Sequence, residues 1–194
     1  MSEWLKNKIS VAILAGGKSG RTGYQKIFAR VGNNSLIDMV YSRFSFFDDV
    51  FAVAREEIRG IRVIKDLFHA GVAGGIATAL LDSKYPQVLV IGADMPFVSP
   101  RPLPHMVKID ADIVVPVWSN KNMEPLYALY SKQIRHSLID FIYRGGKSIS
   151  SFIKNSPHYE ISIEEWISKG IFTFDFFTNL NTPEDFDRFK AFRG

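Results

Sequence analysis

Short runs rich in β-branched residues alternate along this chain with longer segments whose apolar residues recur at helical spacing. The runs expected to form buried strands are residues 11–14, 50–54, 61–65, 88–91 and 113–117. Helices are expected between them, over residues 35–47, 73–83 and 100–108. Alternation of this kind is typical of parallel strands joined by right-handed crossovers. The sequence therefore predicts a three-layer α/β/α, Rossmann-like fold with a mostly parallel central sheet.

The remainder of the chain adds further elements. Strands are expected over residues 125–130 and 171–174, and a helix over residues 133–143. A last helix is expected to begin at Thr182, which is suited to the N-cap, with Pro183 in the first helical position. A length of 194 residues suits a single domain with one substantial core, so we expect residues 1–194 to form one domain.

Glycines and basic residues follow the first predicted strand directly, since residues 14–26 read LAGGKSGRTGYQK. Glycine lets backbone N–H groups approach a ligand closely, and consecutive N–H groups form an anion-binding hollow. Arg21 and Lys26 add matching positive charge, and the planar guanidinium of Arg21 suits phosphate oxygens. Ligands of open α/β sheets bind beyond the carboxyl ends of the strands, where this loop is expected. The pattern indicates a phosphate cradle, with a solvated flexible loop as the alternative.

The spacing of this loop excludes two better-known phosphate-binding patterns. The Walker pattern G-x-x-x-x-G-K-[ST] fails because Arg21 stands five residues after Gly16. The dinucleotide fingerprint G-x-G-x-x-G fails because the glycines stand at positions 16, 17, 20 and 23. The loop instead fits the pattern L-A-G-G-x-S-x-R-x-G-x-x-K.

Two aspartates follow predicted strands and are expected at the same edge of the sheet. Asp94 comes just after the run 88–91. Because Mg²⁺ binds few carboxylates together with phosphate oxygens and water, Asp94 is the candidate metal ligand. A turn-forming aspartate near Pro96 is the alternative. Asp66 ends the run 61–65 and precedes small residues that would let a helix start lie against a nucleotide; a helix-capping or exposed aspartate is the alternative.

The loop and Asp94, together with a third motif, resemble the molybdenum cofactor guanylyltransferase (MobA) family of the nucleotidyltransferase superfamily. The three motifs stand in the family's order: the glycine loop, D-x-P at Asp94, and N-x-N-T-P formed by Asn179 and Asn181 with the two residues that follow. Residues 125–130 also resemble the family's P-L-x-A-L-x strand. Two positions depart from the family pattern, since Val72 stands where proline is usual and Glu124 where glutamine or histidine is more common.

The resemblance implies an enzyme that transfers GMP from GTP to the terminal phosphate of molybdenum-bound molybdopterin. The products would be the guanine dinucleotide cofactor and pyrophosphate, and Mg²⁺ would be required. The implied catalytic residues are Arg21, Lys26 and Asp94, with Asp94 binding the metal. The implied GTP-binding residues are Leu14, Ala15, Gly16, Gly17, Lys26, Asp66 and Asp94, and the acceptor-side residues are Asn179 and Asn181.

The same resemblance implies which part of the chain binds each substrate and which proteins are its partners. Residues 1–117 or thereabouts would bind the nucleotide, and residues 118–194 would bind the pterin acceptor. Other proteins of molybdenum cofactor biosynthesis and molybdoenzyme chaperones would be protein partners.

The alternative functions are a molybdopterin cytidylyltransferase, another nucleotidyltransferase with a phosphorylated acceptor, and a nucleotide-binding adaptor without catalysis. Arg21, Lys26 and Asp94 occurring together argue against the adaptor.

Composition bears on compartment and on nucleic-acid binding. The net charge is +4, but Lys and Arg are spread along the chain without a basic run, so we expect no nucleic-acid partner. No apolar run approaches the roughly 18 residues that span a membrane. Cysteine is absent and the first residues lack the layout of a signal peptide, which favours the cytoplasm.

Overall fold

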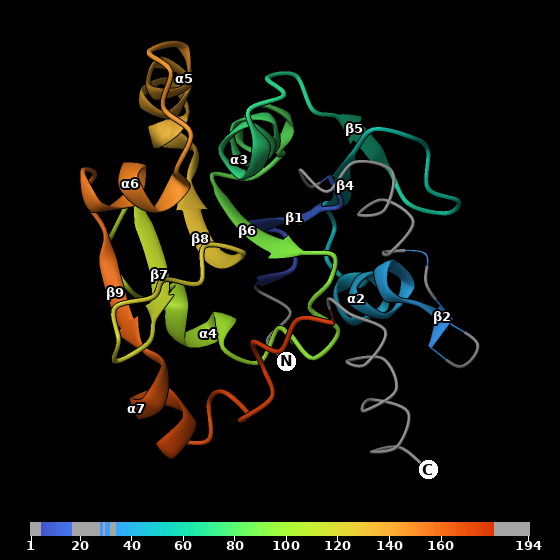
Figure 1. Cartoon of the computed structure of the whole chain (residues 1–194). Helices are drawn as coiled ribbons and strands as arrows, with labels where there is room; N and C mark the ends of the chain where they lie inside the picture. Colours follow the sequence, from blue (N-terminus) through green and yellow to red (C-terminus); the bar gives the residue numbers. More distant parts are fainter. Residues whose placement is uncertain (1–4, 17–27, 29, 32–33, 181–194) are drawn as a thin grey trace.

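The structure is a computed structural model, which describes residues 5–16, 28, 30–31 and 34–180. Its central feature is a seven-stranded sheet of order β5-β4-β1-β6-β8-β7-β9 (Figure 1). The strands are β1 (Ile9–Leu14), β4 (Val50–Ala54), β5 (Val63–Lys65), β6 (Gln87–Gly92), β7 (Ile113–Val117), β8 (Tyr127–Ser131) and β9 (Tyr159–Ser162). A separate two-stranded antiparallel sheet is formed by β2 (Arg30–Val31) and β3 (Asn34–Ser35).

The central sheet is mostly parallel, as the sequence predicts. β1 runs parallel to β4 and β6, β4 parallel to β5, and β7 parallel to β9. β8 is antiparallel to both of its neighbours, β6 and β7. The first residues of β8 therefore lie at the same edge of the sheet as the last residues of β1 and β6.

Helices cover both faces of the sheet, which confirms the three-layer prediction. On one face lie α2 (Leu36–Phe44), α4 (Leu103–Met106) and α7 (Ile163–Ser168), and on the other α3 (Gly71–Asp82), α5 (Arg135–Tyr143) and α6 (Ile149–Lys154) (Figure 1). A short 3₁₀ turn, η2 (Lys132–Ile134), precedes α5. Among the helices of the described segments, none has the length and apolar character needed to cross a membrane.

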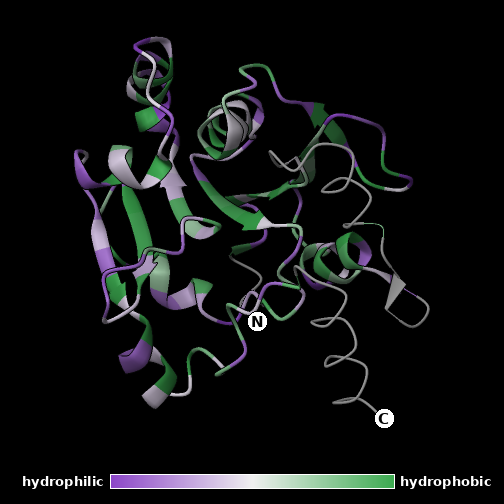
Figure 2. Ribbon diagram, viewed as in Figure 1, coloured by the Kyte–Doolittle hydropathy of each residue, from purple (hydrophilic) through white to green (hydrophobic). Residues whose placement is uncertain are grey.

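The inner strands β1, β4, β6, β7 and β8 are mostly apolar because they are buried on both faces, whereas the edge strands β5 and β9 carry exposed polar residues (Figure 2). In β1, Val11 and Ile13 join the cluster that contains Phe44 of α2. Their neighbours Ala12 and Leu14 point the other way and join the cluster that contains Ile76 of α3. Alternate side chains of one strand thus bind the two helical layers to the sheet.

Ser35 caps α2, as its position in the sequence predicts. The Ser35 hydroxyl accepts a hydrogen bond from the Asp38 backbone N–H at 3.3 Å, and the Asp38 carboxylate accepts one from the Ser35 backbone N–H at 3.2 Å. This reciprocal capping box satisfies two N–H groups at the helix start.

The predicted strand at residues 171–174 is wrong. These residues form turns, in which Phe172 is buried while Thr173 and Phe174 are exposed. Phe172 and Phe176 pack at right angles or tilted against each other and against Tyr127, with ring centroids 4.7–6.3 Å apart. The aromatic spacing therefore serves a cluster beneath the sheet and not a strand. The helix expected from Thr182 lies outside the described residues.

Candidate active site

The start of the glycine loop leaves the sheet between β4 and β6. Leu14 is paired with Gly92 in the parallel register, and its carbonyl accepts a hydrogen bond from the Ala93 N–H at 3.1 Å. Ala15 donates to the carbonyl of Val53 at 2.9 Å. Leu14 and Ala15 are buried and held on both sides, whereas Gly16 is exposed. The backbone thus emerges from a fixed position at the carboxyl edge of the sheet.

Asp94 lies beside this position. It follows β6 by two residues and is half-buried. Its side chain lies over Gly92: a Cβ added to Gly92 would come within 2.8 Å of Asp94 Oδ1 and 3.2 Å of Met95 Sδ. Because Gly92 is the strand partner of Leu14, the structure brings Asp94 next to the start of the loop. The absence of a Cβ at Gly92 leaves space for the Asp94 carboxylate. A carboxylate oxygen is a ligand that suits Mg²⁺, which completes its coordination shell with phosphate oxygens and water.

The third motif also reaches this edge. The Leu180 N–H donates to the backbone carbonyl of Asp94 at 3.1 Å, and the Leu180 side chain is buried against Leu36 and Phe97. Asn179, the preceding residue, is exposed. The structure therefore brings Asn179 close to Asp94, although 85 positions separate them in the sequence. The predicted residues Gly17, Arg21, Lys26 and Asn181 lie outside the described residues.

Asp66 follows β5 and shapes the turn into α3. Its Oδ1 atom accepts hydrogen bonds from the backbone N–H groups of Phe68 (3.0 Å) and His69 (3.2 Å) and from the Thr78 hydroxyl (3.3 Å). These bonds hold His69 at a φ of 50°, in the left-handed region. Asp66 thus stabilises the turn before α3 and does not cap the helix, which has no side-chain cap. Asp66 stands at the same edge as Asp94, three strands away in the sheet.

Helix α3 packs closely on the start of the loop. A Cβ added to Gly75 would lie 3.1 Å from the Leu14 Cδ1 atom, so the glycine permits this close approach. Ala70 at the N-cap makes no side-chain hydrogen bond to the helix start, and the first turn carries no acidic residue. The positive end of the α3 dipole therefore stands beside Asp66, at the edge where the loop begins.

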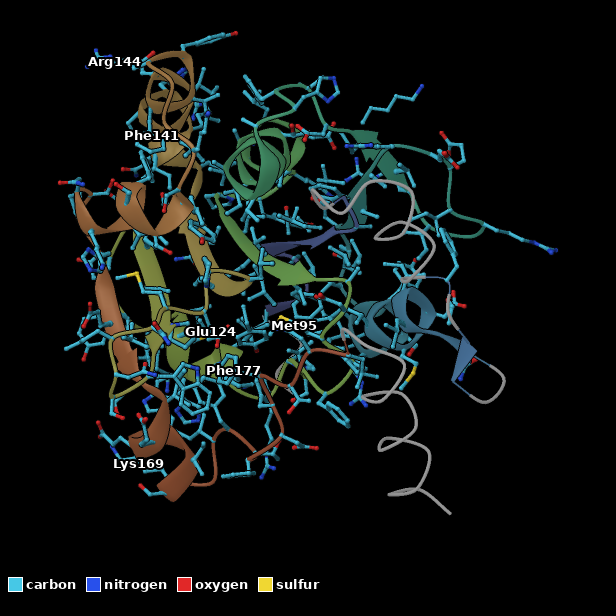
Figure 3. All side chains as sticks on the ribbon, in the orientation of Figure 1. Met95, Glu124, Phe141, Arg144, Lys169 and Phe177 are labelled. Atoms are coloured by element: carbon cyan, nitrogen blue, oxygen red, sulfur yellow. The ribbon has the colours of Figure 1, made fainter. Side chains whose placement is uncertain are left out.

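The other side of Asp94 is formed by the connection between β7 and β8. The Gly92 N–H donates to the carbonyl of Leu126 at 3.1 Å, which ties this connection to the end of β6. Glu124 accepts a hydrogen bond from the Trp118 indole N–H at 2.7 Å, and the Trp118 ring contacts Phe177, three residues before Leu180. Figure 3 shows Glu124 and Phe177 in this region. The sequence pattern marked Glu124 only as a departure from a family motif and gave no sign of Trp118.

Burial affects the ionisation of two groups here. Desolvation raises the pKa of Glu124 above its ordinary value, and the hydrogen bond from Trp118 opposes this rise. Burial also raises the pKa of Tyr127, whose hydroxyl donates to the Ser99 carbonyl at 2.7 Å. Tyr127 is therefore a neutral hydrogen-bond donor that supports the start of β8.

Comparison with known proteins decides the family. The MobA-like NTP transferase domain matches residues 11–159, more than half of the chain. The chain belongs to this family. A probable molybdenum cofactor guanylyltransferase of Pyrococcus furiosus is 31% identical, with 93% of this chain and 96% of the relative covered.

Two solved structures share the fold. Molybdopterin-guanine dinucleotide biosynthesis protein A from Archaeoglobus fulgidus has a TM-score of 0.79 and 26% identity, over 95% of this chain and 98% of that one. The 2-C-methyl-D-erythritol 4-phosphate cytidylyltransferase of Thermus thermophilus, at 16% identity and a TM-score of 0.68, covers the same shares and shares the fold. This MobA-like protein is thus a nucleotidyltransferase with a Rossmann-like fold, and its substrates include a nucleotide.

Proposed function

We propose that this MobA-like protein transfers GMP from GTP to the terminal phosphate of molybdenum-bound molybdopterin. The observation that carries the proposal is the meeting of three sequence motifs at one sheet edge: Leu14 is paired with Gly92, the Asp94 side chain lies over Gly92, and Leu180 bonds to the Asp94 carbonyl. The names of the curated relatives support guanine as the base and molybdenum cofactor as the product.

In this proposal, the reaction is a single in-line displacement. An oxygen of the acceptor phosphate attacks the α-phosphorus of GTP and forms a new P–O bond. The bond between the α-phosphorus and the oxygen that bridges to the β-phosphate breaks, and pyrophosphate leaves with its electron pair. The nucleophile is already an anion, so no general base is assigned. Positioning and charge compensation then carry the catalysis.

We assign roles to the residues along this edge. Leu14, Ala15, Gly16 and Gly17 would line the GTP site, and the N–H groups of Gly16 and Gly17 would bind the phosphates, because the Ala15 N–H is bonded to Val53. Asp66 and the start of α3 would face the nucleoside. Lys26 and Arg21, which lie outside the described residues, would compensate charge at the phosphates. Asp94 would hold Mg²⁺, which when bound supplies positive charge to the triphosphate. Asn179 and Asn181 would face the acceptor.

We also propose that the two halves of the chain share the substrates. Residues 1–117 or so supply β5, β4, β1 and β6, on which the nucleotide would lie. Residues 118–194 supply β8 and β9, which extend the same sheet beyond Asp94 on the other side. The acceptor would lie on this second side, beyond the line of β6. We propose a cytoplasmic location, and contacts with other proteins of molybdenum cofactor biosynthesis and with molybdoenzyme chaperones.

The test is a transfer assay with purified protein, Mg²⁺, molybdenum-bound molybdopterin and either GTP or CTP. The proposal predicts equimolar formation of pyrophosphate and the guanine dinucleotide, with GTP strongly preferred. Preferential use of CTP would identify a cytidylyltransferase instead. Nucleotide binding without pyrophosphate release from either substrate would favour an adaptor.

A further inference from the structure

The two sides of Asp94 differ in the chemistry that they offer. On the β5 side stand the open start of α3 and the first residues of the glycine loop, Leu14–Gly16, both suited to anions. On the β8 side the connection between β7 and β8 presents a carboxylate, that of Glu124. A carboxylate repels phosphate, so this side is not built to hold the charged end of an acceptor.

Glu124 is held firmly by its surroundings. Its backbone N–H donates to the Pro116 carbonyl at 2.8 Å, and Met123 forms a bridge with Val117. The Trp118 indole N–H fixes Oε1 at 2.7 Å. The loop itself is anchored, because the Ser119 N–H donates to the Glu164 carboxylate at 2.9 Å. The position of the Glu124 carboxylate is thus set by the fold.

One oxygen of this carboxylate remains available. Within the described part of the chain, Oε1 bonds to Trp118 and no protein donor reaches Oε2. No side-chain oxygen there is both fully buried and without a partner, so Oε2 is not fully buried. Each carboxylate oxygen has two acceptor sites, so Oε1 retains one as well. Both oxygens of Glu124 therefore keep the capacity to accept N–H bonds from a ligand.

We infer that Glu124 is a specificity-determining residue that recognises the acceptor's heterocycle through an edge with two adjacent N–H donors. The inference rests on the proposed function, because the acceptor there is a pterin. A pterin carries a ring N–H beside an exocyclic amino group, which together match the two oxygens of a carboxylate. The partly desolvated position of Glu124 strengthens such bonds. The phosphate of the same acceptor would then point toward Asp94 and the nucleotide.

The test compares two small heterocycles, pterin and lumazine; in lumazine a carbonyl replaces the exocyclic amine. Binding of each is measured by calorimetry, without turnover. The wild-type protein is expected to bind pterin at least about tenfold more tightly than lumazine, because the lumazine carbonyl opposes the carboxylate. Glu124→Gln is expected to abolish or reverse this preference, since the amide offers one acceptor and one donor. Its side chain still accepts the Trp118 hydrogen bond, so folding is retained.

Glu160→Gln is the matched control, because it removes the same charge from β9 at an exposed site. It is expected to keep the preference for pterin. In the transfer assay, Glu124→Gln should raise KM for molybdenum-bound molybdopterin by about ten- to a hundredfold and leave KM for GTP unchanged.

Two results would overturn the inference. One is equal binding of pterin and lumazine to the wild type, or no binding of either. The other is a preference that Glu124→Gln leaves intact. Failure of the proposed function looks different: the wild type would then make no guanine dinucleotide, whatever its preference between the two heterocycles.

Discussion

Asp94 carries the largest expected effect of any single side chain in the described structure. Replacing it by asparagine removes the negative charge while keeping the size, so the metal loses its only proposed protein ligand. We predict that Asp94→Asn lowers the rate of pyrophosphate release by at least about 100-fold. The rate is measured at saturating GTP and acceptor.

Asp110→Asn is a suitable control for this variant, because Asp110 is exposed and precedes β7, at the opposite edge of the sheet. It should keep full activity. If Asp94→Asn turned over near the wild-type rate, the assignment of Asp94 as the metal ligand would be wrong.

Gly92 is predicted to be required for activity because it leaves space for the Asp94 carboxylate. A Cβ at this position would lie 2.8 Å from Asp94 Oδ1, so the carboxylate of a Gly92→Ala variant must move. We expect a fall in turnover of at least about tenfold, together with a loss of about 1–3 kcal/mol of stability from overpacking. Activity and urea denaturation are measured on the same sample. Unchanged turnover would show that the position of the carboxylate over Gly92 is not important.

The raised pKa of Glu124 predicts how the stability of the protein depends on pH. Its proton is held more tightly in the folded than in the unfolded chain, so this group costs stability as pH rises from about its ordinary value of 4.5 through the raised pKa. Glu124→Gln cannot titrate and lacks this loss. The difference in free energy of unfolding between wild type and variant should therefore grow in favour of the variant across that range. A difference independent of pH would contradict the burial argument.

The positions of candidate site residues were predictable where a motif and a strand end coincide, and their roles stay predictions. Asp94 and Leu14 each stand at a strand's carboxyl end, a position that the apolar runs reveal. Glu124 was not predictable in the same way. Its position depends on Trp118 and on the closeness of Phe177, which are brought together only by the tertiary fold.

The connection from β5 to α3 depends on one buried hydroxyl. Thr78 is fully buried; its hydroxyl accepts a hydrogen bond from the Leu67 N–H at 3.0 Å and lies 3.3 Å from Asp66 Oδ1. Thr78→Val keeps the shape but removes both bonds. We predict a loss of about 1–2 kcal/mol in the free energy of unfolding and a rise in KM for GTP, since the turn at Asp66 is loosened.

Urea denaturation and GTP titration measure the two effects. Thr173→Val, the same change at an exposed site, should alter neither. A stable Thr78→Val variant with normal KM would show that the hydroxyl does not hold the turn.

Strands and helices were predicted correctly where apolar residues form a continuous run or recur at helical spacing. The runs that became β1, β4, β6, β7 and β8 are continuous apolar segments, and α2, α3 and α5 have clear helical spacing or small residues. The short elements α6, β9 and α7 were not predicted, because their four to six residues mix polar and apolar side chains and form neither an apolar run nor a clear period. The run 171–174 resembles a strand in composition, yet Phe172 packs against Tyr127, which is distant in sequence, and Phe174 is exposed.

The order of the strands could not be predicted from local patterns. β8 follows β7 in the chain but lies between β6 and β7, and it runs antiparallel to both. This insertion places the connection that carries Glu124 beside Asp94. The carboxyl edge thus presents Asp66, the loop start, Asp94 and Glu124 along the strand order β5-β4-β1-β6-β8. The proposed separation of nucleotide and acceptor follows from this arrangement.

A crystal structure with Mg²⁺ and a non-hydrolysable GTP analogue tests that separation most directly. We predict a metal ion about 2.1 Å from an Asp94 carboxylate oxygen. The phosphates should lie over residues 14–17, and guanine on the side of Asp66. A nucleotide lying on the Glu124 side, or a metal held without Asp94, would contradict the account.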